Sequence, residues 1–297
     1  MPYELAPGES ASQSVLRIAA EQIDRALSHL ADAASAPEER VHETRKRIKE
    51  MRALLRLARF VLRDDFELEN VWYRDAARSL SAARDAEAVL EAIEKLRAGA
   101  RDGDEHTAVK EAKWALRNAQ REESLADTDA AIARLQPSLA LSRVRLTTWP
   151  PNGWSIAALA RGFERTYADG RRAMRAVIDD PRAERFHEWR KRVKDHWYHV
   201  QLLRNVSPEM TGRMAALQQL SRDLGDHHDL VVLADGIGSG ALLADCEADV
   251  RNVVLELAGR RRAALEQNAV AAGSMLYAEK AASFGKRMES AWKAAAR

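Results

Sequence analysis

The sequence predicts an all-α protein with about ten helices, and three observations support this fold class. Alanine, leucine, arginine and glutamate dominate the composition, whereas the 297 residues include only 14 glycines and 8 prolines, so helix formers outnumber helix breakers. Apolar residues recur at spacings of three and four, the period of one helix face. No segment shows the alternating apolar and polar residues that are typical of a half-buried strand.

Turn formers and helix caps divide this pattern into its elements, in order along the chain. In the first half, the expected breaks fall near Ala36-Pro37, Asp64-Asp65, Gly99 to Gly103 and Asp127. In the second half, they fall near Asp180-Pro181, Ser207-Pro208, Gly225, Gly236 to Gly240 and Gly273. Proline ends a helix because it lacks an amide donor and disfavours helical geometry in the residue before it.

The strongest break is the segment from Trp149 to Gly153, which contains two adjacent prolines. We place the boundary between two halves there, at about 10–148 and 154–297, with residues 1–9 as an N-terminal extension. The chain length allows one large or two smaller cores.

The overall charge does not identify a partner, because 47 lysines and arginines nearly balance 45 aspartates and glutamates. An argument for an anionic ligand therefore depends on where the basic residues lie. The single cysteine, Cys246, cannot form an internal disulfide. No apolar run approaches the roughly 18 residues of a membrane span. We therefore expect a cytoplasmic protein that does not enter a membrane.

An internal repeat carries the main functional signal. The segment Val41 to Glu50 aligns with Phe186 to Asp195 at a constant offset of 145 positions, and six of the ten residues are identical. A looser match follows at an offset of 144, where Asp85 corresponds to Asp229. We interpret the two halves as structural duplicates.

Projection of the repeat onto a helix separates a basic face from a packing face. In the first copy, the packing face contains Thr44, Ile48, Met51, Leu55 and Ala58. In the second copy, it contains Phe186, Trp189, Val193 and Val200. The basic face holds His42, Arg45, Lys46, Lys49 and Arg56 in the first copy, and His187, Arg190, Lys191, Lys194 and Tyr198 in the second. Arg47 and Arg192 fall outside both faces.

A single charged stripe is usually a solvated helix face, and either histidine alone is more often a core residue than a ligand contact. Solvated faces mix charges of both signs, however, whereas these faces contain no acid. Cations three and four residues apart repel each other. The same repulsion at equivalent places in both halves indicates an anionic ligand that offsets it.

These residues resemble the CHAD family, the conserved histidine α-helical domain, whose hallmark is a His-x-x-Arg-Lys-x-x-Lys helix in each of two halves. Both copies are intact here, and the similarity extends over most of the chain, so that 10–297 would form a single CHAD domain. Further similarity lies in Tyr167 to Arg172, Lys194 to Tyr198, Leu220 to Gly225 with Asp229, and Ala83 to Asp85.

The resemblance implies two four-helix bundles related by pseudo-twofold symmetry, with the basic helices lining a central groove or pore that holds inorganic polyphosphate. The residues of the two basic faces would be the polyphosphate contacts. Further candidate contacts are Arg52, Arg78, Arg84, Arg171 and Arg222. We expect a bacterial protein that associates with polyphosphate granules.

Three alternatives bear on this function. The first is binding of nucleic acid by the same basic surface, and we favour nucleic acid less than polyphosphate as the partner. The second, a metal-dependent phosphatase or polyphosphatase, lacks support because the chain has no phosphoryl-transfer or hydrolase motif. We therefore predict no enzymatic activity, no catalytic residues and no cofactor. The third is a metal site, for which the sequence offers only His196, His199, His227 and His228 without a zinc-site spacing, so we predict no metal.

Overall fold

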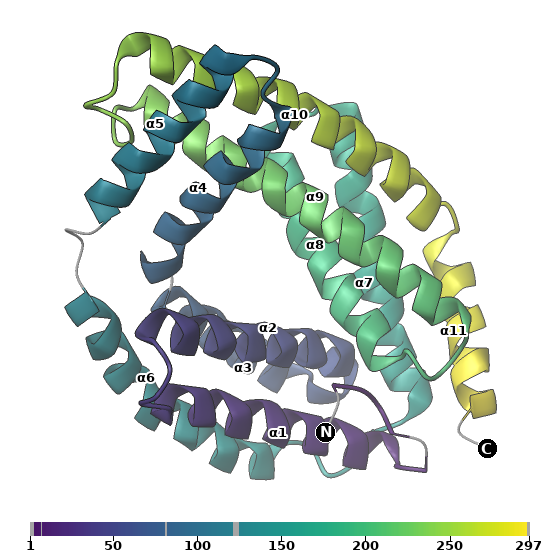
Figure 1. The fold of residues 1–297 in the computed structure, drawn as a ribbon. Helices are drawn as coiled ribbons and strands as arrows, with labels where there is room; N and C mark the ends of the chain where they lie inside the picture. The colour runs from purple at the N-terminus through teal and green to yellow at the C-terminus, as the bar shows by residue number, and fades with distance from the viewer. Residues whose placement is uncertain (1–2, 7, 81, 121–124, 296–297) are drawn as a thin grey trace.

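The computed structural model describes residues 3–6, 8–80, 82–120 and 125–295, and within these ranges it contains eleven α-helices, two short 3-10 turns and no strand. The side chains of residues 82–87, 120 and 125–128 also lie outside this description. The predicted all-α class is confirmed. The helices, drawn in Figure 1, are α1 (Ala11–Ala31), α2 (Pro37–Leu62), α3 (Asp64–Arg78), α4 (Ala82–Leu96), α5 (Gly103–Gln120), α6 (Leu125–Arg145), α7 (Ile156–Asp179), α8 (Ala183–Leu202), α9 (Glu209–Gly238), α10 (Ala248–Leu276) and α11 (Ala281–Ala295).

Local sequence explains most of the helix ends. Ser10 caps α1 in a capping box with Gln13, and Pro37 occupies the first turn of α2, where a missing amide costs nothing. The expected break at Gly225 is wrong, because Gly225 lies inside α9. The break expected near Gly273 falls slightly later, because α10 ends at Leu276. At Gly273 a side chain would collide with the ring of Trp189, so packing against α8 requires glycine there.

The repeat offset recurs in the helix starts. The helices α1 and α7 begin at Ala11 and Ile156, 145 positions apart, and α5 and α10 begin at Gly103 and Ala248, also 145 apart. The helices α3 and α9 begin with the same spacing, but α9 continues unbroken where the first half divides into α3 and α4. The duplication is therefore visible in the helix order, while the pseudo-twofold relation of two four-helix bundles stays a prediction.

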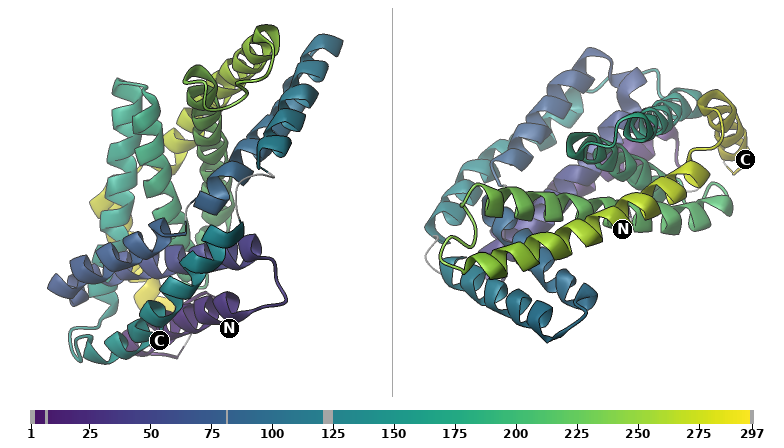
Figure 2. Two further views of the ribbon diagram at one scale, coloured as in Figure 1. Left: turned by 90° about the vertical axis from the view of Figure 1, so that its left-hand side faces the viewer. Right: turned by 90° about the horizontal axis from the view of Figure 1, so that it is seen from above.

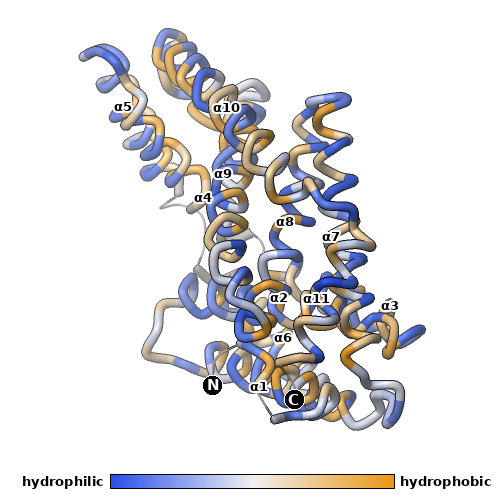
Figure 3. Tube along the Cα trace, turned by 90° about the vertical axis from the view of Figure 1, so that its right-hand side faces the viewer, coloured by the Kyte–Doolittle hydropathy of each residue, from blue (hydrophilic) through white to orange (hydrophobic). Residues whose placement is uncertain are grey.

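Two hydrophobic cores hold the helices together, and both combine residues from the two halves. The main core contains residues such as Leu54 of α2, Trp189 of α8 and Phe284 of α11. The second core joins α4 and α5 to the C-terminal part of α9 and to α10, with Ile93 and Leu233 in its centre. Figure 2 shows α4 and α5 beside α9 and α10, away from α1. Hydrophobic and hydrophilic positions alternate along the helices in Figure 3, as expected for amphipathic helices around a shared core.

The helix α2 links the two halves, because it packs on α1 and α3 of the first half and on α7 and α8 of the second. Close approach of α7 depends on Gly162, where a Cβ atom would lie 2.0 Å from the Leu57 carbonyl oxygen of α2. The N-terminal extension also joins α2 to α8. The Tyr3 hydroxyl donates to the Glu50 carbonyl at 2.7 Å, and the Leu5 amide donates to the Leu202 carbonyl at 3.0 Å. In the described part of the chain, none of the helices combines the length and apolarity needed to cross a membrane.

Candidate anion-binding site

The first basic motif lies on α2, whose packing face is buried as predicted. Thr44, Ile48 and Met51 are at most 1% exposed. On the other side, the His42 and Lys46 side chains are 45% and 46% exposed. The Arg45 guanidinium donates to the Ala77 carbonyl at 2.5 Å, at the C-terminal end of α3, where helix carbonyls lack partners. The motif thus combines exposed cations with one arginine that also holds α3.

The second motif lies on α8, which also has a buried packing face and an exposed basic face. Phe186, Trp189 and Val193 are at most 1% exposed, which confirms the predicted packing face. The Lys191 side chain is 48% exposed, close to the value for its counterpart Lys46. Both motifs therefore present cations from helices whose opposite faces are fixed in the core.

An acid–arginine–acid triad flanks each motif. In α2, Arg47 contacts Glu50 at 2.7 Å and Glu43 at 3.3 Å. In α8, the equivalent Arg192 contacts Glu188 at 2.5 Å and Asp195 at 3.6 Å. Arg47 and Arg192, which lie off the basic faces, are thus each neutralised by acids of their own helix.

The faces themselves contain no acid, but the same acids reach their edge. Lys46 lies 3.5 Å from Glu43, and Lys191 forms the equivalent ion pair with Glu188. The contact forms because a glutamate three residues before a lysine reaches it over one helical turn. Exposed pairs of this kind contribute at most about 1 kcal/mol, so an anion can displace them.

The two motif-bearing helices touch each other directly beyond their motifs. The Arg56 guanidinium of α2 lies 3.1 Å from the Asp195 carboxylate of α8, and the Nε2 atom of His199 donates to the Ala53 carbonyl of α2 at 2.7 Å. Burial raises the pKa of Asp195, and Arg56 and Arg192 oppose that rise. Arg56 is therefore an interhelix partner of Asp195 rather than an exposed part of the basic face.

The placement of Tyr198 on the second basic face is also corrected. Its side chain is 4% exposed and belongs to the main core. The ring packs edge-on against Tyr3 at a centroid distance of 6.2 Å, and burial raises its pKa. The N-terminal extension covers this tyrosine, and the repeat contains no signal for that contact.

A histidine pair lies at the start of the second motif. The Nδ1 atoms of His187 and His228 are 3.1 Å apart, so one ring donates to the other. Burial lowers the pKa of His187, and Lys191 and Arg190 lower it further. Burial also lowers the pKa of His228 to about 4, with His187 and Arg190 as the next causes. The sequence identified His228 only as a weak metal candidate, because its proximity to α8 depends on how α9 packs.

The further candidate arginines are scattered. Arg171 donates to the Tyr277 carbonyl at 3.0 Å, at the end of α10. Arg78 and Arg222 are exposed, on α3 and α9. Arg84 belongs to α4, and its side chain lies outside the described residues. Arg52 donates to Asn70 at 3.3 Å and lies near the contact between α2 and α8.

The other three candidate metal ligands, His196, His199 and His227, are buried. His196 and His199 are fully buried, and His196 accepts a hydrogen bond from the Arg213 guanidinium at 3.1 Å. His227 lies 2.8 Å from Glu266. Among the described residues, no three histidine, cysteine or acidic side chains are grouped as metal ligands.

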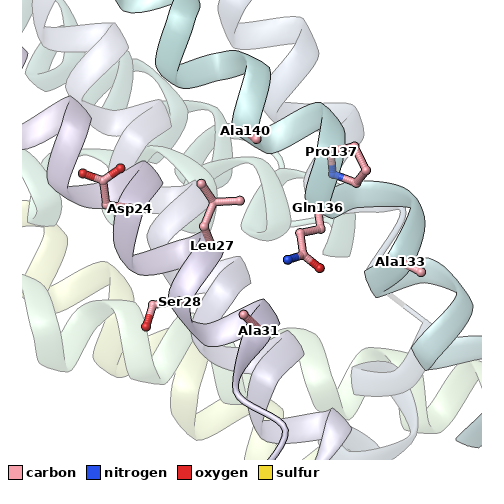
Figure 4. A pocket seen from close by; sticks show the side chains of 8 residues that line it. All are labelled: Asp24, Leu27, Ser28, Ala31, Ala133, Gln136, Pro137 and Ala140. Atoms are coloured by element: carbon pink, nitrogen blue, oxygen red, sulfur yellow. The ribbon is translucent and has the colours of Figure 1, made fainter.

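Two surface hollows lie away from the basic helices. The larger, of about 730 Å³ between α1 and α6, has Asp24 as its only charged lining residue (Figure 4). The other, of about 340 Å³, contains Arg145, but Glu69 holds that arginine at 2.7 Å. Neither of these two hollows suits an anion.

The fold and the repeat define an all-α protein with a duplicated basic helix, and comparison with known proteins identifies its family. The family model described as the CHAD domain matches residues 17–237, and the chain belongs to this family. The structure is similar to the crystal structure of the CHAD domain from the plant Ricinus communis, with a TM-score of 0.63 and 19% sequence identity, over 95% of this chain and 97% of that chain. No curated protein matches the chain.

Proposed function

We propose that this protein binds inorganic polyphosphate, without transforming it, on the basic faces of α2 and α8. The observation that carries the proposal is the equivalent arrangement of both motifs. Lys46 and Lys191 are similarly exposed, and the flanking arginines Arg47 and Arg192 are neutralised in both copies. The helices also contact each other through Arg56 and Asp195, which supports binding of one flexible anion by both motifs.

Polyphosphate suits this arrangement because it has no bases to read and carries closely spaced negative charges. Arginine offers bidentate hydrogen bonds to phosphate oxygens, and lysine offers a mobile point charge. Imidazole donates to phosphate most strongly when it is protonated. By analogy with nucleic acids, the release of counterions should make the affinity fall steeply with salt.

The test is a calorimetric titration of the protein with long-chain polyphosphate near physiological salt. The variant carries Lys46→Glu and Lys191→Glu, two exposed positions where charge reversal leaves the core intact. We expect at least about a tenfold loss of affinity, since each site loses a charge-assisted interaction. The matched control carries Lys110→Glu and Lys293→Glu, which change the net charge equally on distant exposed positions of α5 and α11. Equal affinity of variant and control would contradict the site.

Two further outcomes would contradict the function itself. Tighter binding to single- or double-stranded nucleic acid than to polyphosphate would favour the nucleic-acid alternative. Release of phosphate from polyphosphate in the presence of divalent cations would indicate a hydrolase. In cells, we expect a fluorescent fusion of the protein to colocalise with polyphosphate granules and the double variant to lose that localisation.

A further inference from the structure

The two copies of the basic helix diverge directly after their motifs. At the repeat offset of 145, Arg52 of α2 corresponds to Trp197 of α8, and Arg56 corresponds to Gln201. Lys194 lies over the Trp197 ring, with its ammonium 5.8 Å from the centroid. The α2 end of the site therefore carries two cations that the α8 end lacks.

Arg52 is half-buried among other arginines. Its Nε donates to the Asn70 amide oxygen at 3.3 Å. The charges of Arg56, Arg74 and Arg192 repel its guanidinium, and the charge of Asp195 attracts it. Burial lowers the pKa of Arg52 to about 10, with Arg56 as the next cause, so it stays charged near neutral pH.

The nearby carboxylates are held by other arginines. Asp195 lies between Arg56 at 3.1 Å and Arg192 at 3.6 Å. On α3, Asp75 pairs with Arg74 at 2.9 Å. Among the described residues, no carboxylate lies within 4 Å of Arg52. The guanidinium groups of Arg52, Arg56 and Arg192 thus lie around Asp195, and Glu188 is a second carboxylate, held by Arg192.

This imbalance is unfavourable in the unliganded protein. A cation that is partly removed from water loses solvation, and neighbouring cations add repulsion that the more distant Asp195 opposes. Asn70 supplies one neutral acceptor, which replaces only part of the lost hydration. An anion with several acceptor oxygens would satisfy the remaining guanidinium donors and reduce the repulsion at the same time.

We propose that Arg52 anchors a phosphate group in a subsite where α2 meets α3 and α8, at one end of the basic surface. The proposal rests on the proposed function, in that the phosphate is one unit of a condensed phosphate chain. Arg56 and Arg192 contribute to the field at the subsite while they remain paired with Asp195. The site is consequently asymmetric, because Trp197 replaces this anchor at the equivalent place on α8.

The test compares Arg52→Gln with the control Arg74→Gln in the full chain. Arg74 lies nearby and carries the same charge, but its carboxylate partner Asp75 compensates it. The probes are tripolyphosphate and long-chain polyphosphate, measured by calorimetry near physiological salt. We expect Arg52→Gln to weaken binding of tripolyphosphate about tenfold and Arg74→Gln to change it less than about twofold. Without ligand, Arg52→Gln should raise the Tm by about 2 °C, because repulsion is relieved.

The outcomes separate this subsite from the proposed function. Unchanged affinity of Arg52→Gln for tripolyphosphate overturns the subsite even when wild type binds long-chain polyphosphate. A lower Tm together with an equal affinity loss in Arg74→Gln also overturns it, because that pattern indicates a structural role. If wild type fails to bind long-chain polyphosphate but tripolyphosphate raises its Tm only when Arg52 is present, the subsite stands and the proposed function fails. Should Arg52→Gln not fold, Arg52→Lys keeps the charge without the bidentate fork and should weaken tripolyphosphate binding severalfold, with unchanged affinity overturning the subsite.

Discussion

The buried histidine at the contact between α2 and α8 makes the stability of the protein depend on pH. His199 is fully buried, its Nε2 atom donates to the Ala53 carbonyl at 2.7 Å, and burial lowers its pKa to about 4. In the unfolded chain, the same ring titrates near pH 6.5. Between these values the unfolded state takes up a proton that the folded state excludes, so stability is lost as the pH falls from about 6.5 towards 4.

The expected size follows from the two pKa values of His199. At pH 5, selective protonation of the unfolded chain lowers the free energy of unfolding by about 2 kcal/mol, and at pH 7 its effect is only a few tenths. The variant His199→Gln keeps an amide donor for Ala53 but cannot take up the proton. Urea unfolding at pH 7 and pH 5, at equal ionic strength, should show wild type losing about 2 kcal/mol more than the variant. Equal losses within about 0.5 kcal/mol would refute a depressed pKa for His199.

Two further predictions concern the histidine pair and the packing of α10. If polyphosphate binds near His187 and His228, it should raise their lowered pKa values, so protons are taken up and affinity rises as the pH falls from 8 to 6. Calorimetry in buffers of different ionisation enthalpy measures the uptake, which His228→Ala should reduce. Gly273→Ala should lower the free energy of unfolding by about 1–3 kcal/mol, since its Cβ would lie 2.4 Å from the Trp189 ring. Gly259→Ala, with no atom within 4 Å of its Cβ, should be neutral or stabilising in the same urea measurement.

Local sequence predicts the helices where local chemistry decides their ends. Pro37 and Asp64 begin α2 and α3 as expected, because proline and acidic residues are favoured in the first turn of a helix. Gly225 was expected to end a helix, yet it lies within α9, and α10 continues past Gly273 to Leu276. Their role depends on the neighbouring helix, since Gly225 faces Arg190 and Gly273 faces Trp189. A propensity scale contains no information about that neighbour.

In the candidate site too, local sequence predicts some features, and others depend on distant parts of the chain. Helical projection places Lys46 and Lys191 on exposed faces, because their direction depends only on the helix that carries them. Helical projection fails for Arg56 and Tyr198, because the residues that contact these side chains come from distant parts of the chain. Arg56 meets Asp195 of the other half, and Tyr198 lies under the N-terminal segment at Tyr3.

The acids beside the motifs shape the site as much as its cations do. Glu50 and Asp195 occupy equivalent positions, and both are held by the equivalent arginine, Arg47 or Arg192. Each pair neutralises one cation that lies off the basic face formed by the histidine, arginine and two lysines of the motif. Asp195 also accepts Arg56 from α2, whereas the residue equivalent to Arg56 in the second half is the uncharged Gln201. A carboxylate of one half is thus compensated by a cation of the other, which couples the orientation of the two basic helices.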